Sequence, residues 1–150
     1  MAIIDSRLAF GEDALITVSA DAPNPIDLGA YEAVGARDAI ARGDPVWWVN
    51  QVTEKAVGNG RLRLQLFAKE NPEQATGKLL MHSQYFYPVD LVVGAYWNAV
   101  VPVTSLSIGN VLVVNFRVSS PYFTSLRMSS YLTASPPVSG SEGIYFDWRS

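Results

Sequence analysis

The strongest constraint on the fold is a strict alternation of apolar and polar side chains beside a small-residue turn. In the segment GRLRLQLF, at 60–67, Leu62, Leu64 and Leu66 alternate with Arg61, Arg63 and Gln65. Successive side chains of a strand point to opposite faces, so the leucines share one face and the polar residues the other. The preceding segment 45–57 alternates in a similar way, and the GNG at 58–60 tolerates the positive φ of a tight hairpin. The sequence therefore predicts an antiparallel hairpin from about 46 to 68.

Several further segments carry the same β signal, and turn residues separate them. Expected strands are 14–19, 78–86, 99–104, 111–119, 126–134 and 144–148. The alanine-rich segment 29–44 is the exception, but Gly35 interrupts it and its apolar residues keep no helical rhythm. We expect an excursion loop there, with at most one helical turn near 36–41. Many short strands joined by turns rich in proline and glycine indicate an all-β protein, a jelly-roll-like antiparallel β-sandwich.

The ends of the chain differ in composition from its middle. We expect an N-terminal arm at 1–13, the sandwich at 14–134, and a linker with an aromatic tail at 135–150. The stretch SPPVSGSEG at 135–143 has the composition of a linker, and Pro136 and Pro137 would end a strand. The apolar start and the aromatic end therefore lead to the hypothesis that one or both termini lie on neighbouring subunits.

Composition restricts the class of protein. A chain of 150 residues is most simply one domain, and the absence of cysteine excludes disulfides, a thiolate nucleophile and cysteine-bound metal. Acids outnumber bases by fourteen to eleven, whereas nucleic-acid binders show a basic excess. The densest basic group, Arg61, Arg63 and Lys69, is better explained as a solvated strand face. No signal peptide or membrane span is visible, so we expect a chain made in a cytoplasm, with no nucleic-acid or membrane partner.

Reactive chemistry is sparse. The single histidine, His82, lies in a strand candidate, and no GxSxG elbow accompanies it. No lysine follows GNG, so this segment is not a phosphate-binding loop. Most acids occupy turn positions, where carboxylates bond to local backbone. We therefore expect no enzyme, no catalytic residue, no cofactor and no metal site; a hydrolase would need His82 beside a serine and an acid in a cleft.

The aromatic residues point instead to binding. Trp47 and Trp48 are adjacent on one strand, so one faces the core and the other faces outward. The outer tryptophan either lies beneath a loop such as 29–44 or serves as an interface anchor, since aromatic residues are enriched where proteins meet. Trp97, Tyr122 and Phe123 raise the same question, as do Tyr145, Phe146 and Trp148. These aromatics favour a protein that binds a partner, either another protein or a sugar.

The order of several motifs resembles the capsid cement proteins of tailed bacteriophages, in particular the Bordetella-phage type. The motifs are MAIID, NPIDLGA, ARDAIARGDPVWWVNQVTEKA, GRLRLQLFAKEN, LVVGAYWNAVVPV and VLVVNFRVSS, which span roughly 1–134. The resemblance implies a jelly-roll-like fold and a non-enzymatic decoration protein on the virion's outer capsid surface. It implies that the chain clamps neighbouring major capsid protein subunits against internal DNA pressure, as a homo-oligomer, dimer or trimer.

The resemblance leaves the interface residues to be chosen from apolar and aromatic character. The candidates are Ile3, Ile4, Phe10, Trp47, Trp48, Trp97, Tyr122, Phe123, Tyr145, Phe146 and Trp148. The alternative function is a carbohydrate-binding β-sandwich module of a phage tail or receptor-binding assembly. A sugar site would place two or three aromatics in one plane beside polar groups, whereas a clamp would place them at subunit contacts.

Overall fold

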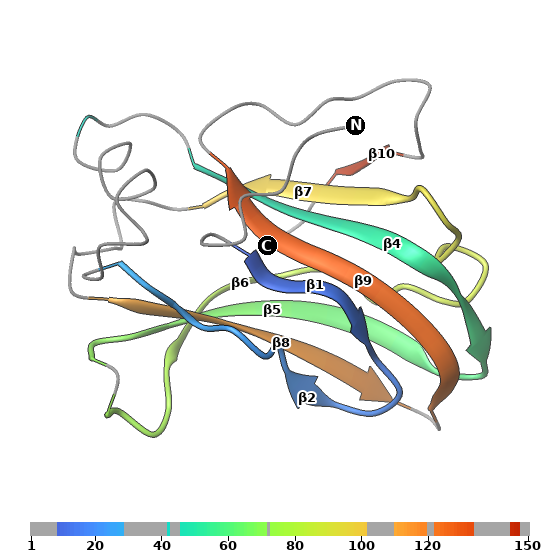
Figure 1. The fold of residues 1–150 in the computed structure, drawn as a ribbon, viewed down its shortest axis with the longest axis horizontal. Coiled ribbons are helices and arrows are strands. Elements are labelled where there is room, and N and C mark those ends of the chain that lie inside the picture. The colour runs from blue at the N-terminus through green and yellow to red at the C-terminus, as the bar shows by residue number, and fades with distance from the viewer. Residues whose placement is uncertain are drawn as a thin grey trace.

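In a computed structural model, the chain folds into two β-sheets that pack face to face (Figure 1). The structure describes residues 9–28, 42, 46–71, 73–101, 110–119 and 122–133, together with the backbone of 145–147. The expected all-β antiparallel sandwich is confirmed. The alanine-rich segment is outside the described residues except for Arg42, as are 1–8 of the arm and 135–144 of the linker.

The first sheet, sheet A, has five strands in the order β1-β9-β4-β7-β10. Their bounds are Ala9–Leu15 for β1, Phe123–Thr133 for β9, Trp47–Gly58 for β4, Tyr96–Val100 for β7 and Tyr145–Asp147 for β10. The first four strands pair antiparallel, whereas β10 runs parallel to β7. Because β1 begins at Ala9, residues 9–13 of the expected arm belong to this sheet.

The second sheet, sheet B, has the order β2-β8-β5-β6, and β3 also pairs with β8. Their bounds are Ala20–Asp21 for β2, Val111–Ser119 for β8, Arg61–Lys69 for β5, Lys78–His82 for β6 and Ile26–Asp27 for β3. All pairs in this sheet are antiparallel. Across both sheets the pairing is nested along the chain: β1 with β9, β2 with β8, β4 with β7 and β5 with β6.

The predicted hairpin is wrong in its pairing, although both of its strands form. β4 pairs with β7 and β9 in sheet A, whereas β5 pairs with β6 and β8 in sheet B. The GNG segment therefore crosses from one sheet to the other. Each strand buries one alternating face, and the two faces meet across the core instead of lying side by side in one sheet.

Close packing at this crossing explains both of its glycines. Gly58 has φ of +126°, and a Cβ there would lie 2.8 Å from the carbonyl oxygen of Tyr122. A Cβ on Gly60 would lie 2.9 Å from the carbonyl carbon of Tyr122. The crossing thus packs against the backbone that enters β9, and only glycine leaves room for this approach.

The space between the sheets is filled by aromatic and aliphatic side chains from both layers. The largest fully buried side chains are Trp48, Trp97, Phe10, Phe86, Phe123, Leu28, Leu62, Leu64, Leu66, Leu91, Leu112 and Leu126. The rings of Trp97 and Phe86 lie 4.4 Å apart between centroids, at a tilt. All three alternating leucines of β5 are among these core residues, so the sequence rhythm assigned their face correctly.

One polar side chain on the inner face of sheet A has no partner among the described residues. Asn50 is fully buried, opposite Trp97 and Ser130, and neither its amide nitrogen nor its oxygen makes a hydrogen bond. A buried polar group without a partner costs about 1–3 kcal/mol.

Replacing Asn50 with leucine, which has a similar shape, is therefore expected to raise the free energy of unfolding by about 1–2 kcal/mol. Chemical denaturation measures this change. Gln51→Leu is the control, because the Gln51 amide donates to the Tyr96 hydroxyl at 3.0 Å and its loss brings no such gain. Lower stability of the Asn50 variant would show that this amide is hydrogen-bonded within the core.

Candidate interaction surfaces

The side chains around the single histidine are held by local backbone bonds. His82 is half-buried on β6, with Nδ1 3.0 Å from the carbonyl oxygen of Ser83. The buried Ser83 hydroxyl accepts from the backbone N–H of Leu64 and donates to the carbonyl of Gln84. This hydroxyl therefore links the segment that follows β6 to the backbone of β5. Within the described ranges, no three His, Asp or Glu side chains gather as a metal site.

The adjacent tryptophans face opposite sides of sheet A. Trp48 is on the inner face with no exposed surface, and its indole N–H donates to the Ser130 hydroxyl at 2.9 Å. Trp47 is on the outer face, half-buried. Its partners there belong to a small second cluster with Val49, Tyr96 and Tyr131. Trp48 is thus a core residue. Trp47 is the outer tryptophan, for which the sequence allows either a place beneath a loop or a role as an interface anchor.

The centre of the outer cluster on sheet A is buried, whereas Trp47 and Tyr96 at its edge are half-buried. Val49 has no exposed surface and Tyr131 retains only 5%. Burial raises the pKa of Tyr131, and the charge of Tyr96 raises it further. The Gln51 amide donates to the Tyr96 hydroxyl here. A sugar platform needs open ring faces, and the buried Tyr131 does not offer one.

Three other interface candidates are core residues. Phe10, Trp97 and Phe123 each have no exposed surface. Their side chains complete the space between the sheets, so they have no surface to offer a partner in this fold. These three residues and Trp48 are therefore core residues and not interface anchors.

The terminal candidates are less fully described. Ile3, Ile4 and Trp148 lie outside the described residues. Tyr145 and Phe146 are described as backbone, and they pair with Tyr96 and Trp97 as strand β10. This part of the tail thus extends sheet A of its own chain.

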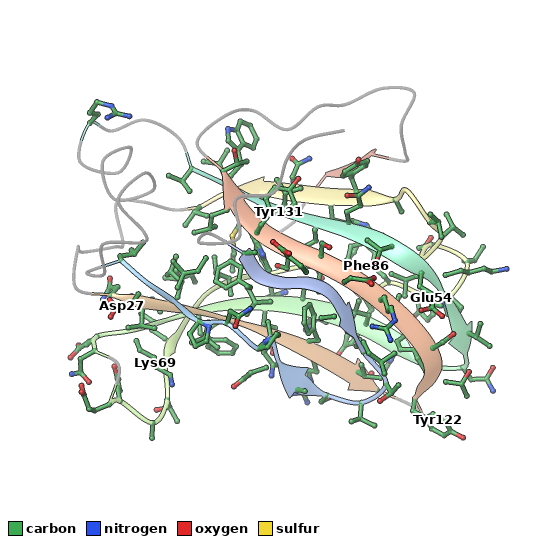
Figure 2. The ribbon with its side chains drawn as sticks, viewed as in Figure 1. Asp27, Glu54, Lys69, Phe86, Tyr122 and Tyr131 are labelled. Carbon is green, nitrogen blue, oxygen red and sulfur yellow. The ribbon has the colours of Figure 1, made fainter. Side chains whose placement is uncertain are left out.

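Tyr122 remains an exposed candidate, and it belongs to a larger apolar surface. Seven of the nine large apolar side chains exposed in the described residues lie on strand ends or connections that backbone bonds join near the end of β4 and the start of β9. We call this set the apolar end: Leu15, Val18, Val57, Tyr87, Val89, Val93 and Tyr122. Figure 2 shows Tyr122 at this end, where β4 ends and β9 begins.

Backbone bonds bring the segments of the apolar end together. The N–H of Phe123 donates to the carbonyl of Thr17, which joins the β1–β2 connection to the start of β9. The N–H of Ala56 donates to the carbonyl of Leu91, which joins the loop before β7 to the end of β4. Val89 is 81% exposed and Tyr122 50% exposed. Clustered apolar exposure of this kind marks interaction sites, whereas scattered exposure does not.

A second surface, on the outer side of sheet B, is basic. It carries Arg61, Arg63 and Lys69 from β5 and Arg117 from β8, a set we call the basic face. Arg63 stands directly opposite Arg117 in the antiparallel register. The β5 cations were visible in the sequence, but Arg117 was missed, because its place beside them follows from strand pairing and not from spacing.

Comparison with known proteins adds no assignment. No protein-family model matches the chain, and no curated protein shows significant similarity to it. The resemblance to cement proteins therefore depends on the sequence motifs alone.

Proposed function

We propose that the chain is a structural cement protein of a phage capsid. It binds the outer surface of the shell, clamps neighbouring major capsid protein subunits and acts as a homo-oligomer without enzymatic activity. The order of motifs over 1–134 and the nested strand pairing, which fits a jelly roll, support this proposal.

The observation that carries the proposal furthest is the apolar end. A clamp gains strength from contact area and from the number of copies, not from one deep pocket. Seven apolar side chains from three connections and two strand ends offer such an area. Exposed apolar surface is retained where a partner covers it. The apolar end is therefore the contact surface for the shell, with Tyr122 as an aromatic anchor.

Placing charges on the apolar end tests this assignment. The double variant Val89→Asp with Tyr122→Asp should lower the affinity for shells at least about tenfold, because each carboxylate would be desolvated in the contact. Occupancy of shells at a series of chain concentrations measures the effect.

The matched control is Leu79→Asp with Val100→Asp. These are the two remaining exposed large apolar residues of the described chain, on β6 and β7 and outside the apolar end. The control should bind as wild type does. Equal occupancy of both double variants would contradict the assignment of the apolar end, and thermal melts verify that each variant is folded.

A further inference from the structure

The basic face is a continuous strip along β5. Arg61, Arg63, Gln65, Phe67 and Lys69 alternate with the buried leucines, so all five share the outer side of sheet B. At about 3.3 Å per residue, the strip from Arg61 to Lys69 is about 26 Å long. This length suits an extended chain better than a single small molecule.

The cations of this strip form no ion pair within the described part of the chain. No carboxylate there lies within ion-pairing distance of Arg61, Arg63, Lys69 or Arg117; the ion pair at 3.0 Å between Arg127 and Glu54 is on sheet A. Arg63 and Arg117 oppose each other directly, and like charges at opposed positions destabilise a sheet. An anion bound between the two guanidinium groups would remove this repulsion.

Two of the arginines are already ordered. The guanidinium groups of Arg61 and Arg63 lie over the ring of Tyr85, with Cζ 4.5 and 4.1 Å from its centroid. The Nε of Arg61 donates to the Ser119 hydroxyl at 3.0 Å. Side chains held in this way lose less conformational entropy when a ligand binds, and the planar guanidinium suits a carboxylate.

A groove of about 320 Å³ continues the strip from Arg117 toward Lys69. Phe67 and Val113 form its apolar part, and the amides of Gln65 and Asn115 stand opposite each other between the two cations. Asp21 also lines the groove, and one of its carboxylate oxygens accepts from the Asn115 amide at 2.8 Å, which leaves the charge of Asp21 in place. The groove thus offers amides for main-chain bonds, an apolar floor and a cation at either end.

We infer that the basic face binds an extended acidic segment of a partner protein. Alternate residues of an extended peptide lie about 6.6 Å apart on one side, which is the repeat of Arg61 and Arg63 along β5. Acidic side chains would therefore reach successive cations while the peptide backbone faces the amides. The inference rests on the proposed function in taking the partner to be a protein, and it adds the chemistry of the contact.

A peptide probe tests this inference without capsids. A short fluorescein-labelled peptide with glutamate at alternate positions is titrated with the full chain, and fluorescence anisotropy reports binding. We expect saturable binding that weakens as salt is added, because exposed charges are screened. The double variant Arg63→Gln with Arg117→Gln should weaken binding at least about tenfold.

The control, Lys55→Gln with Arg127→Gln, also removes two positive charges, but from sheet A. It should bind the peptide as wild type does. Arg117→Gln alone is the second variant, since no described residue forms a hydrogen bond or ion pair with that side chain, and its loss should not affect folding. No binding by wild type at low salt, or an equal loss in the control, would overturn the inference. So would a single-stranded oligonucleotide of equal charge that binds as tightly as the peptide. None of these results would affect the proposed function, which is measured on shells.

Discussion

Replacing Trp48 with alanine is expected to lower the free energy of unfolding by about 3–5 kcal/mol, the range for removing a large aromatic side chain from a packed core. The indole has no exposed surface, so its removal leaves a cavity between the sheets. The variant also leaves the Ser130 hydroxyl without the N–H that donates to it at 2.9 Å. Equilibrium unfolding in urea or guanidinium measures the change.

The adjacent residue provides the matched control. Trp47→Ala removes the same side chain from the outer face, where it is half-buried, and should cost only about 1–2 kcal/mol. A larger loss for Trp47 than for Trp48 would contradict the assigned faces of β4. It would thereby contradict the register that places Leu132 and Ala99 opposite Trp48.

Replacing Gly58 with alanine is expected to lower the free energy of unfolding by about 2–4 kcal/mol, because two costs combine. Alanine is strained at φ of +126°, and its Cβ would lie 2.8 Å from the Tyr122 carbonyl oxygen. A side-chain movement cannot remove the clash, because the atoms nearest to this Cβ belong to the backbone of Tyr122, Phe123 and Thr124. The effect should appear in the unfolding midpoint with little change in the denaturant dependence of the free energy.

Asn59→Ala is the control for the crossing. Asn59 lies between the two glycines with its side chain exposed, and its replacement should change the free energy of unfolding by no more than about 0.5 kcal/mol. In a hairpin of paired β4 and β5, the close approach of Gly58 to Tyr122 would not exist. Equal, small effects at both positions would therefore contradict the crossing between sheets.

The sequence predicted which side of each strand is buried, but not which strands pair. Alternation assigned Leu62, Leu64 and Leu66 to the core, and it required that only one of Trp47 and Trp48 lie inside. A period of two gives the face of a strand and contains no information about its neighbour. The GNG turn fits a hairpin locally, and contacts with Tyr122, distant in the sequence, decide that it crosses between sheets.

The same limit applies to the candidate surfaces. Phe10, Trp97 and Phe123 were interface candidates because an aromatic residue near a loop looks the same in sequence whether it faces the core or solvent. The apolar end had a readable signal in YPVDLVVG, at 87–94, where exposed valines occupy a turn-rich loop. Its other members come from the ends of β1 and β4 and from two further connections, and only the fold places them near that loop.

We propose that this sandwich stabilises a capsid by adhesion, and heating shells with and without bound chain tests this role. Empty shells assembled from the major capsid protein that the proposed function takes as the partner are titrated with purified chain and then heated. We expect saturation at a fixed ratio of chain to capsid subunit and a higher temperature of shell disruption at saturation. Shells that bind no chain, or that bind it without any gain in heat resistance, would contradict the claim.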